Sequence, residues 1–516
     1  SLSANTTGAS NTAVGKDALL ANTTGTRNTA IGATAGDAMT TVSDNTYVGH
    51  GAGTANTSGD HNTGVGQASM DELTTGANNT AIGSNSLSGV VTGDSNTAVG
   101  KSALNANTSG ADNTAVGALA LDANTTADGN TAVGSSALGA NTTGADNVAM
   151  GEAALLSNTT ANANTAVGTS ALRANTTGHN NTSIGVSSMA ANTTGVSNVA
   201  VGSNALDANT TASNNTAVGK DALTANTTGT NNTAVGHLSL TTNTTTNNNT
   251  AVGVSALQAN VAGTENQAFG TFALTSNTTG GDNTSVGYNS LGAATTGDNN
   301  VALGLRAGET LTTGTHNVLI GKNAGSYDGA DITTGTQNVL VGNFNKVSAA
   351  DSANQIVMGY YVTSAGNSNF TFGNGTTDSN ISFGETSIGA PSDVRLKEDI
   401  QDEEVGLDFI NDLRPVTFLW KKEKDVPSEM NVYKADSETR VMNGKYNHGF
   451  IAQEVKEVID NHNLKDGFEM WQEDEADGRQ RLGEGALMSV MVKAVQELSA
   501  QVEELKTQPK CKCNKE

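Results

Sequence analysis

Apolar and polar positions alternate along the first two thirds of the chain in a pattern that repeats every 17 residues. Each unit has the form Asn-Thr-Ala-Val-Gly-x-x-Ala-Leu-x-Ala-Asn-Thr-Thr-Gly-x-x. A glycine holds the same place in 19 consecutive units from Gly15 to Gly321, among them Gly32 and Gly100. An asparagine stands four residues before each of these glycines, for example Asn11, Asn28 and Asn96. A period of this length indicates stacked structural repeats.

Two stretches of each unit alternate with a period of two, as β-strands do. In the first unit they are residues 12–15 and 18–21, and turn residues follow each of them. A unit of two short strands cannot bury its apolar face alone, but identical units can do so as coils of a parallel β-solenoid. With one strand spacing of ~4.8 Å per coil, about twenty coils form a rod roughly 100 Å long.

The glycine and the asparagine have structural roles in such a coil. Glycine at the strand end allows a sharp corner or a positive φ. Asparagine at a turn tolerates left-handed geometry, and stacked copies can hydrogen-bond one another in a ladder. A leucine or methionine stands four residues after the glycine in 15 of the 19 units. The exceptions are Gly36, Gly53, Gly308 and Gly325.

Composition separates this repeat from the rest of the chain. All four prolines and both tryptophans lie at or after residue 391. From residue 392 onward there are 27 acidic and 18 basic residues, which leaves 23 of the 50 acidic and 8 of the 26 basic residues before it. With 60 glycines and only 4% aromatic residues in the chain, the first part cannot build an ordinary globular core.

Charge and cysteine content exclude several classes of protein. A formal net charge of −24 repels phosphate backbones, so we expect no nucleic acid partner. The two cysteines, Cys511 and Cys513, lie in a polar tail and give neither a disulfide framework nor zinc spacing. We expect no metal, no cofactor and, without an 18-residue apolar run, no membrane insertion. Because the chain starts at Ser1 without a methionine, we expect that an N-terminal piece is missing from it.

The repeat resembles a known family of surface proteins. Ser-Asn-Thr-Ala-Val-Gly at 95–100 is similar to the Asn-Ser-Val-Ala-Ile-Gly repeats of trimeric autotransporter adhesin heads, although the period of 17 is longer than is usual there. The resemblance implies a trimeric parallel β-roll. The Asn-Thr-Thr triplets also fit the glycosylation acceptor pattern, and threonine rows could order water as in ice-binding solenoids. We favour a structural role for both, because turns require these residues.

Regularity breaks after Gly321, since the next equivalent glycine, Gly342, comes four residues late. The added length falls at 326–331, which is either a contact site or a tolerated insertion. We therefore predict a repeat solenoid over 1–342 and an irregular β-rich neck over 343–391.

From Ser392 onward, four segments occur in a recognisable order. They are Ser-Asp-Val-Arg-Leu-Lys from 392, Gly-Leu-Asp-Phe-Ile with Leu-Arg-Pro-Val from 406, His-Gly-Phe-Ile-Ala-Gln-Glu-Val from 448, and Val-Gln-Glu-Leu from 495. Together they resemble the intramolecular chaperone domain of phage tail fibres and tailspikes, the endosialidase-type auto-processing family. The resemblance implies that the domain trimerises, templates folding of the fibre and is released by cleavage of the Pro391–Ser392 bond. It also implies that Ser392 is the nucleophile and Lys397 the activating base.

The chemistry of this pair sets a geometric demand. A serine hydroxyl needs a base, and a lysine serves as one only where burial lowers its pKa. Five residues of separation place the two side chains about 140° apart on a helix and on opposite faces of a strand. A turn, or a lysine from a neighbouring chain, is needed to join them. Our hypothesis is that the pair forms only in the trimer.

The end of the chain reads as a helix with a heptad seam. Its apolar residues follow a 3-4 spacing: Met488, Met491, Val495, Leu498, Val502 and Leu505. Two and a half heptads are too short to stand alone, so the rest of the domain must support them. We predict an α+β chaperone domain over 392–486, a trimeric coiled-coil helix over 487–508 and a polar tail over 509–516.

These expectations combine into a mainly β homotrimer that serves as a virion tail fibre or tailspike. We expect it to be made in the host cytoplasm, joined to other tail proteins, and directed at a bacterial surface glycan or protein. Its chemistry would be at most one self-cleavage. A trimeric surface adhesin is one alternative. A polysaccharide depolymerase is another, although such enzymes cluster carboxylates that are scattered in this repeat.

Overall fold

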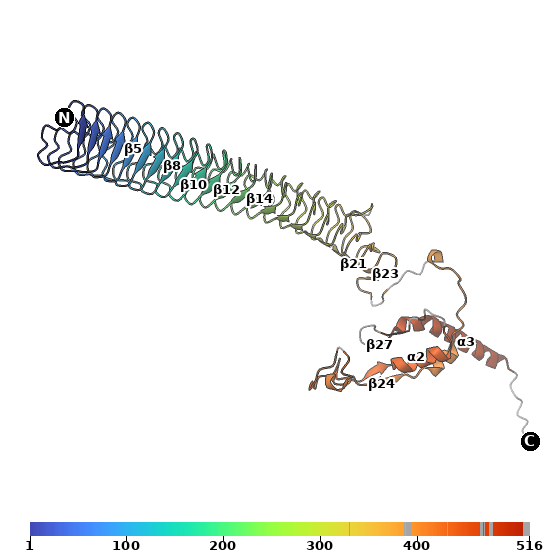
Figure 1. The fold of residues 1–516 in the computed structure, drawn as a ribbon. Helices are drawn as coiled ribbons and strands as arrows, with labels where there is room; N and C mark the ends of the chain where they lie inside the picture. The colour runs from blue at the N-terminus through green and yellow to red at the C-terminus, as the bar shows by residue number, and fades with distance from the viewer. Residues whose placement is uncertain are drawn as a thin grey trace, which may run out of the picture. The chain divides into compact units, whose positions relative to one another are not determined.

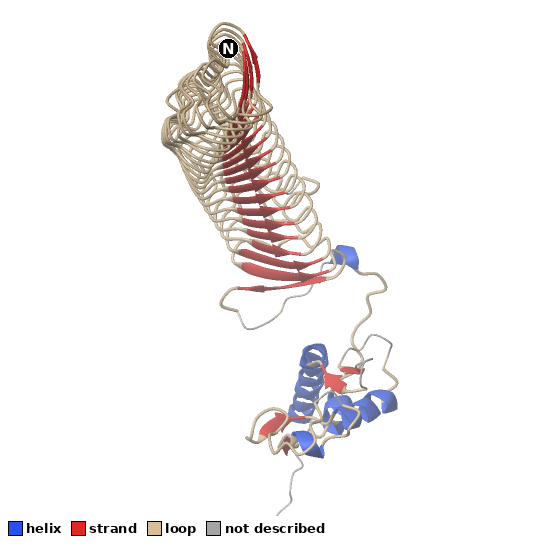
Figure 2. Ribbon diagram, turned by 60° about the vertical axis from the view of Figure 1, so that its left-hand side comes forward, coloured by secondary structure: helices blue, strands red, loops and turns tan. Residues whose placement is uncertain are grey.

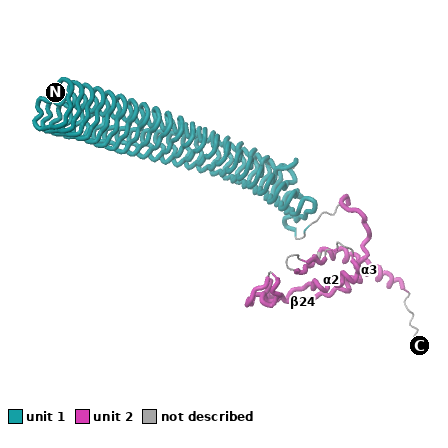
Figure 3. The backbone as a smooth tube through the Cα atoms, in the orientation of Figure 1, with its two compact units in different colours: residues 1–391 teal, residues 392–516 magenta. Residues whose placement is uncertain are grey.

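The computed structural model of the protein describes residues 1–329, 331–385, 388, 394–430, 432–464, 468, 470–473 and 478–508. The chain divides into two compact units, Ser1–Pro391 and Ser392–Glu516 (Figure 3). The first unit is a β-solenoid of 17-residue coils, and the second is a small α+β domain. The protein is therefore mainly β.

Each coil contributes one three-residue strand, and the strands stack along one face of the solenoid (Figures 1 and 2). Each strand pairs in parallel with the next one along the chain, so that Ala98 lies beside Ala115 and Ala115 beside Ala132. The strands are β1 Thr12–Val14, β2 Thr29–Ile31, β3 Thr46–Val48, β4 Thr63–Val65, β5 Thr80–Ile82, β6 Thr97–Val99, β7 Thr114–Val116, β8 Thr131–Val133, β9 Val148–Met150, β10 Thr165–Val167, β11 Thr182–Ile184, β12 Val199–Val201, β13 Thr216–Val218, β14 Thr233–Val235, β15 Thr250–Val252, β16 Gln267–Phe269, β17 Thr284–Val286, β18 Val301–Leu303, β19 Val318–Ile320 and β20 Val339–Val341.

The strand alternation decides what is buried. The central residue, usually alanine, points inward and is fully buried from β2 onward, as in Ala98. The flanking threonine and valine point outward. Several of these outward apolar residues are more than a third exposed: Val14, Ile31, Ile82, Val116, Met150, Ile184, Phe269, Leu303 and Met358. The sheet therefore carries a row of solvent-facing apolar side chains.

The prediction of a second strand in each unit, at residues 18–21 in the first unit, is wrong. This stretch is a turn, because Asp17 and Leu19 have φ values of 59° and 48°. The left-handed backbone directs Leu19 into the core, where it is fully buried. Its N–H donates to the carbonyl of Ala35 in the next coil at 3.0 Å, so the turns stack as regularly as the strands.

The corner glycine has the predicted role. Gly15 has a φ of 134°, and a Cβ on it would lie 2.4 Å from the carbonyl oxygen of Gly32 in the next coil. Every coil repeats this close approach of two backbones, as between Gly100 and Gly117 at 2.5 Å. Only glycine fits such a stacked corner.

The predicted asparagine ladder is present, but the left-handed residue precedes the asparagine. Ser95 has a φ of 60°, and the N–H of Asn113 donates to Asn96 Oδ1 at 3.1 Å. A second buried ladder joins the triplet asparagines, in which Asn124 Nδ2 donates to Asn107 Oδ1 at 3.0 Å. From Asn22 onward the triplet asparagines of this ladder are fully buried, so the structural interpretation of the Asn-Thr-Thr motif is confirmed. Triplet threonines also bond within the stack, since Thr108 Oγ1 donates to the Thr125 carbonyl at 2.8 Å.

The four glycine exceptions lie beside a large core residue of their own coil or of a neighbouring one. Tyr47 replaces the inward alanine of β3 and is fully buried, and a Cβ on Gly53 would lie 2.5 Å from its ring. A Cβ on Gly308 would lie 2.6 Å from Leu319, and one on Gly325 would lie 3.6 Å from Leu340. Glycine at these positions therefore makes room for a bulky neighbour in its own coil or the adjacent one, so that the core stays closely packed.

The solenoid continues beyond residue 342, past the predicted boundary with the neck. Strand β20 keeps its register with β19 across the insertion, with Val339 beside Val318. Strand β21 (Gln355–Gly359) pairs in parallel with β20, and β22 (Asn369–Gly373) with β21. The antiparallel strand β23 (Asp378–Ser382) then ends the sheet. The strand stack therefore continues across the insertion.

The second unit has three α-helices, α1 (Leu407–Asp412), α2 (Ala452–Asn461) and α3 (Leu487–Thr507), among its described residues. Strand β24 (Val416–Phe418) pairs antiparallel with β25 (Asn447–Gly449), and β26 (Trp471–Glu473) with β27 (Gln480–Leu482). The 3-10 turns are η1 Val394–Leu396, η2 Glu423–Asp425 and η3 Glu484–Ala486. A core of Phe409, Leu413, Val455, Ile459, Met470, Leu487 and Val490 joins the three helices. None of the helices described in either unit has the length and apolar character needed to cross a bilayer.

Candidate assembly and processing site

Helix α3 presents two apolar stripes with different surroundings. Leu487, Val490 and Ala494 face the domain core and are less than 9% exposed. The other stripe, which we call the α3 seam, consists of the residues predicted from the heptad spacing. These are Met488, Met491, Val495, Leu498, Val502 and Leu505, between 41% and 66% exposed. One side of the helix is thus anchored, while the α3 seam is exposed.

Glu497 fixes the orientation of α3 against α1. Its Oε2 accepts a hydrogen bond from the N–H of Leu407, the first residue of α1, at 2.8 Å. A carboxylate at this position satisfies a free N–H of the helix and favours its positive end. Gly406 leaves room for the contact, because a Cβ there would lie 2.4 Å from Glu497 Oε2. The seam is therefore displayed by a helix that its own domain holds in place.

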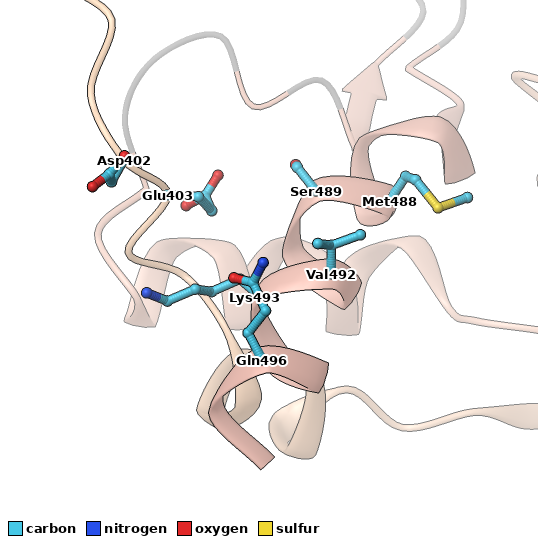
Figure 4. Close-up of a pocket in the computed structure, with 7 residues that line it drawn as sticks. All are labelled: Asp402, Glu403, Met488, Ser489, Val492, Lys493 and Gln496. Atoms are coloured by element: carbon cyan, nitrogen blue, oxygen red, sulfur yellow. The ribbon is translucent and has the colours of Figure 1, made fainter. Parts of the chain in front are cut away.

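A shallow pocket of about 660 Å³ lies beside the seam (Figure 4). The segment that precedes α1 contributes Asp402 and Glu403. Helix α3 contributes Met488, Ser489, Val492, Lys493 and Gln496. Met488 and Val492 are 66% and 52% exposed, so the apolar surface of α3 continues from the seam into this pocket.

The segment after residue 393 also exposes apolar side chains. Val394, Leu396 and Ile400 are between 67% and 73% exposed, which is unusual for three such residues in seven positions. Lys397, the predicted base, lies among them with an exposed side chain, next to the short turn η1. Pro391 and Ser392, the predicted cleavage site and nucleophile, lie outside the described residues, as does Asp393.

A bidentate ion pair joins two of the recognised segments. Arg414 Nε donates to Glu454 Oε2 at 3.0 Å, and Arg414 Nη2 contacts Glu454 Oε1. Hydrogen bonding to the carboxylate raises the pKa of Arg414, and the same bond lowers the pKa of Glu454. His448 lies in β25 opposite Thr417 with an exposed side chain. The arginine pair holds the start of β24 against α2.

Sequence reasoning located the seam and Lys397 but missed Glu497 and the exposed apolar run at 394–400. The run was visible as Val394, Leu396 and Ile400 within a charged stretch. The role of Glu497 could not be predicted, because its hydrogen-bond partner lies 90 residues away in the sequence. Across the described ranges, no group of three or more histidine, cysteine, aspartate or glutamate side chains is arranged to hold a metal ion. Cys511 and Cys513 lie outside those ranges.

A comparison with known protein families gives a match that lies in the second unit. The family described as "Chaperone of endosialidase" matches residues 392–464, from the start of this unit to the end of α2. The C-terminal unit therefore contains a domain of the chaperone-of-endosialidase type, and the matched range ends before α3. No curated protein matches the chain, and no solved structure does.

Proposed function

We propose that the protein is a homotrimeric fibre of a virion tail, in which the solenoid forms the shaft or receptor-binding part and the C-terminal domain drives trimerisation and folding. Its receptor is a glycan or protein of a bacterial surface, and it joins other tail proteins after synthesis in the host cytoplasm. The observation that carries the proposal is the exposed α3 seam on a chaperone-of-endosialidase domain.

The energetics of the seam support self-association. Burying a large apolar side chain contributes about 1.5–3 kcal/mol when it is fully exposed beforehand. The six seam residues are roughly half exposed, so each contributes about 1 kcal/mol on burial. A trimeric coiled coil would bury the seam of all three chains at once.

The solenoid offers a second apolar surface for contact between chains. Its outward apolar row runs from Val14 in β1 to Met358 in β21 on one face of the sheet. Because successive coils differ little, two such rods could pair one coil out of register. A domain that first aligns three C-terminal helices fixes the register of the coils ahead of it, which explains why the two units share a chain.

We further propose that the C-terminal domain is released by cleavage before Ser392, with Lys397 of a neighbouring chain as the base. The exposed run of Val394, Leu396 and Ile400 supports this, because a neighbouring chain that covers it would also desolvate Lys397. Proton removal from the Ser392 hydroxyl would then depend on assembly.

Charge substitution in the seam tests the trimer. Val495→Asp with Leu498→Asp places two carboxylates in it, and light scattering should then report a single-chain mass. Ala500→Asp is the matched control, since it adds charge at an exposed site about 200° around the helix from Leu498. Trimers that survive the seam substitutions, or are lost equally in the control, would refute the proposal.

Mixed assemblies test the cleavage. Denaturing electrophoresis of the wild-type chain should show two bands that collapse to one in Ser392→Ala. Coexpressed Ser392→Ala and Lys397→Ala chains should restore cutting of the Lys397→Ala chain, because a mixed trimer holds one intact pair across two chains. Absence of cutting in mixed trimers would exclude a cross-chain pair.

A further inference from the structure

Four aromatic side chains gather on the surface of the last coils of the solenoid. These residues, Tyr327, Phe344, Tyr360 and Tyr361, form what we call the aromatic patch. Tyr327 comes from the insertion at 326–331, while Phe344 and Tyr361 occupy the same position of successive coils. Coil stacking and the insertion thus bring together rings that are far apart in the sequence.

The rings form a connected cluster. Phe344 and Tyr361 are stacked with centroids 4.8 Å apart, and Tyr327 meets Tyr361 edge-on at 5.3 Å. Tyr360 lies 4.8 Å from Tyr361 and is 54% exposed. The Tyr361 hydroxyl donates to the Tyr327 hydroxyl oxygen at 2.9 Å, and this bond raises the pKa of Tyr361 to about 12. Tyr361 therefore remains a protonated donor at neutral pH.

Two lysines flank the cluster. Lys322 Nζ lies 5.3 Å from the Phe344 ring centroid, and Lys346 Nζ lies 5.5 Å from that of Tyr327. The first 391 residues contain only 8 basic residues, so two ammonium groups on one patch are a local concentration. The acidic neighbours in the insertion are Asp328, which is exposed, and Asp331, whose Oδ1 is buried without a hydrogen-bond partner among the described residues.

The fold does not require these side chains. In other coils the two positions after the corner glycine hold residues as different as Ser135 with Ser136 and Lys101 with Ser102, and the strand pairing is the same. Four connected rings at the surface of a chain with only 4% aromatic residues indicate a binding surface. The flat rings and paired cations decide what kind of ligand fits.

We propose that the aromatic patch binds an acidic saccharide. A pyranose ring presents polarised C–H groups that pack on the negative face of an aromatic ring, here the exposed Tyr360. Its carboxylate would accept charge-assisted hydrogen bonds from Lys322 and Lys346. The role of this site as the receptor contact rests on the proposed fibre function, but the binding chemistry does not, because every residue of the patch comes from one chain.

Calorimetry with the full-length chain tests the assignment. The probes are oligosaccharides of hexuronic acids, namely oligogalacturonate, oligoalginate and hyaluronan fragments, with maltoheptaose as the neutral comparison. We expect binding of at least one acidic probe that weakens with added salt. Tyr360→Ala should lower its affinity at least tenfold, and so should the double substitution Lys322→Ala and Lys346→Ala.

Matched controls come from the same solenoid. Tyr288→Ala removes a 45% exposed tyrosine outside the patch, and Lys101→Ala removes an exposed lysine that follows its corner glycine as Lys322 does. Both should bind like wild type. The proposal is overturned if no acidic probe binds, if the neutral probe binds equally well, or if patch and control variants lose affinity alike. A chain that binds the sugar as a monomer would refute the fibre proposal and leave this one standing.

Discussion

A double-mutant cycle at Tyr47 and Gly53 tests whether each coil conserves its core volume. Tyr47→Ala removes a fully buried ring whose hydroxyl accepts a hydrogen bond from Asn56 Nδ2 at 3.0 Å, at an expected cost of about 3–5 kcal/mol. Gly53→Leu introduces the residue that most coils have, but its Cβ would lie 2.5 Å from the Tyr47 ring. We expect it to cost about 1–3 kcal/mol through overpacking. Backbone strain is not the cause, because Leu19 and Leu87 adopt φ values of 48° and 47° at the same place.

The two substitutions together restore the usual alanine and leucine pair. We expect the double variant to cost only about 1–2 kcal/mol, from the lost Asn56 bond and the space beside Gly64, where a Cβ would lie 2.8 Å from the tyrosine ring. The coupling energy is then at least about 2 kcal/mol, in the upper part of the range for residues in contact.

Native-state hydrogen exchange of peptides from residues 29–82 measures the local free energy of opening, and thermal unfolding gives an independent ranking. Tyr47→Ala with Gly308→Leu is the matched control, since Gly308 faces Leu319 and not Tyr47. The costs should add in the control pair. Additive costs in the Tyr47 and Gly53 pair as well would refute compensation within the coil.

Four further predictions concern single residues. Asn158→Ala removes the hydrogen bonds that Asn158 Nδ2 donates to Asn141 Oδ1 at 2.9 Å and to the Ala161 carbonyl at 3.0 Å. We expect hydrogen exchange to show a loss of local stability of about 2–4 kcal/mol. As the control, Thr143→Ala at an exposed position should have little effect. Glu497→Gln should destabilise the C-terminal unit by about 0.5–1 kcal/mol, because it removes the carboxylate charge beside the start of α1. Tryptophan fluorescence during urea unfolding measures this, since both tryptophans lie in that unit. An unchanged urea midpoint would argue against the α1 contact. Burial raises the pKa of Asp207, so its charged form disfavours the fold; Asp207→Asn should raise the melting temperature at neutral pH, with the gain shrinking as pH falls through the raised pKa. Asp221→Asn should do the opposite, because hydrogen bonding to Lys220 lowers the pKa of Asp221.

The repeat itself was predictable because period, strand and corner are all local. Thr-Ala-Val before a glycine predicts a strand with its central residue on the inner face, and each coil has a strand there. The stretch around Leu19 was not predictable, since leucine rarely takes a positive φ and only stacking against the next coil satisfies its N–H. The glycine exceptions were readable in principle, because Gly53 follows the bulky Tyr47 within one unit.

The C-terminal site was harder to predict from the sequence, because it depends on contacts between residues that are far apart in the chain. Heptad spacing located the α3 seam, since a helix surface follows from its own sequence. No local pattern encodes the contact by which Glu497 anchors α3, because it is a tertiary contact. The same holds for the contacts between rings in the aromatic patch of the solenoid. Phe344 and Tyr361 lie 17 residues apart, so the repeat period could have paired them, but Tyr327 lies in the insertion, which has no counterpart in the other units.

The central claim is that three chains associate through an apolar stripe that a single chain leaves in water. Sedimentation equilibrium of the uncleaved Ser392→Ala chain measures this most directly. The account predicts one species of about 156 kDa, three times the chain mass of 52.1 kDa. A stable, monodisperse species at the mass of one chain, with its helix intact, would contradict it.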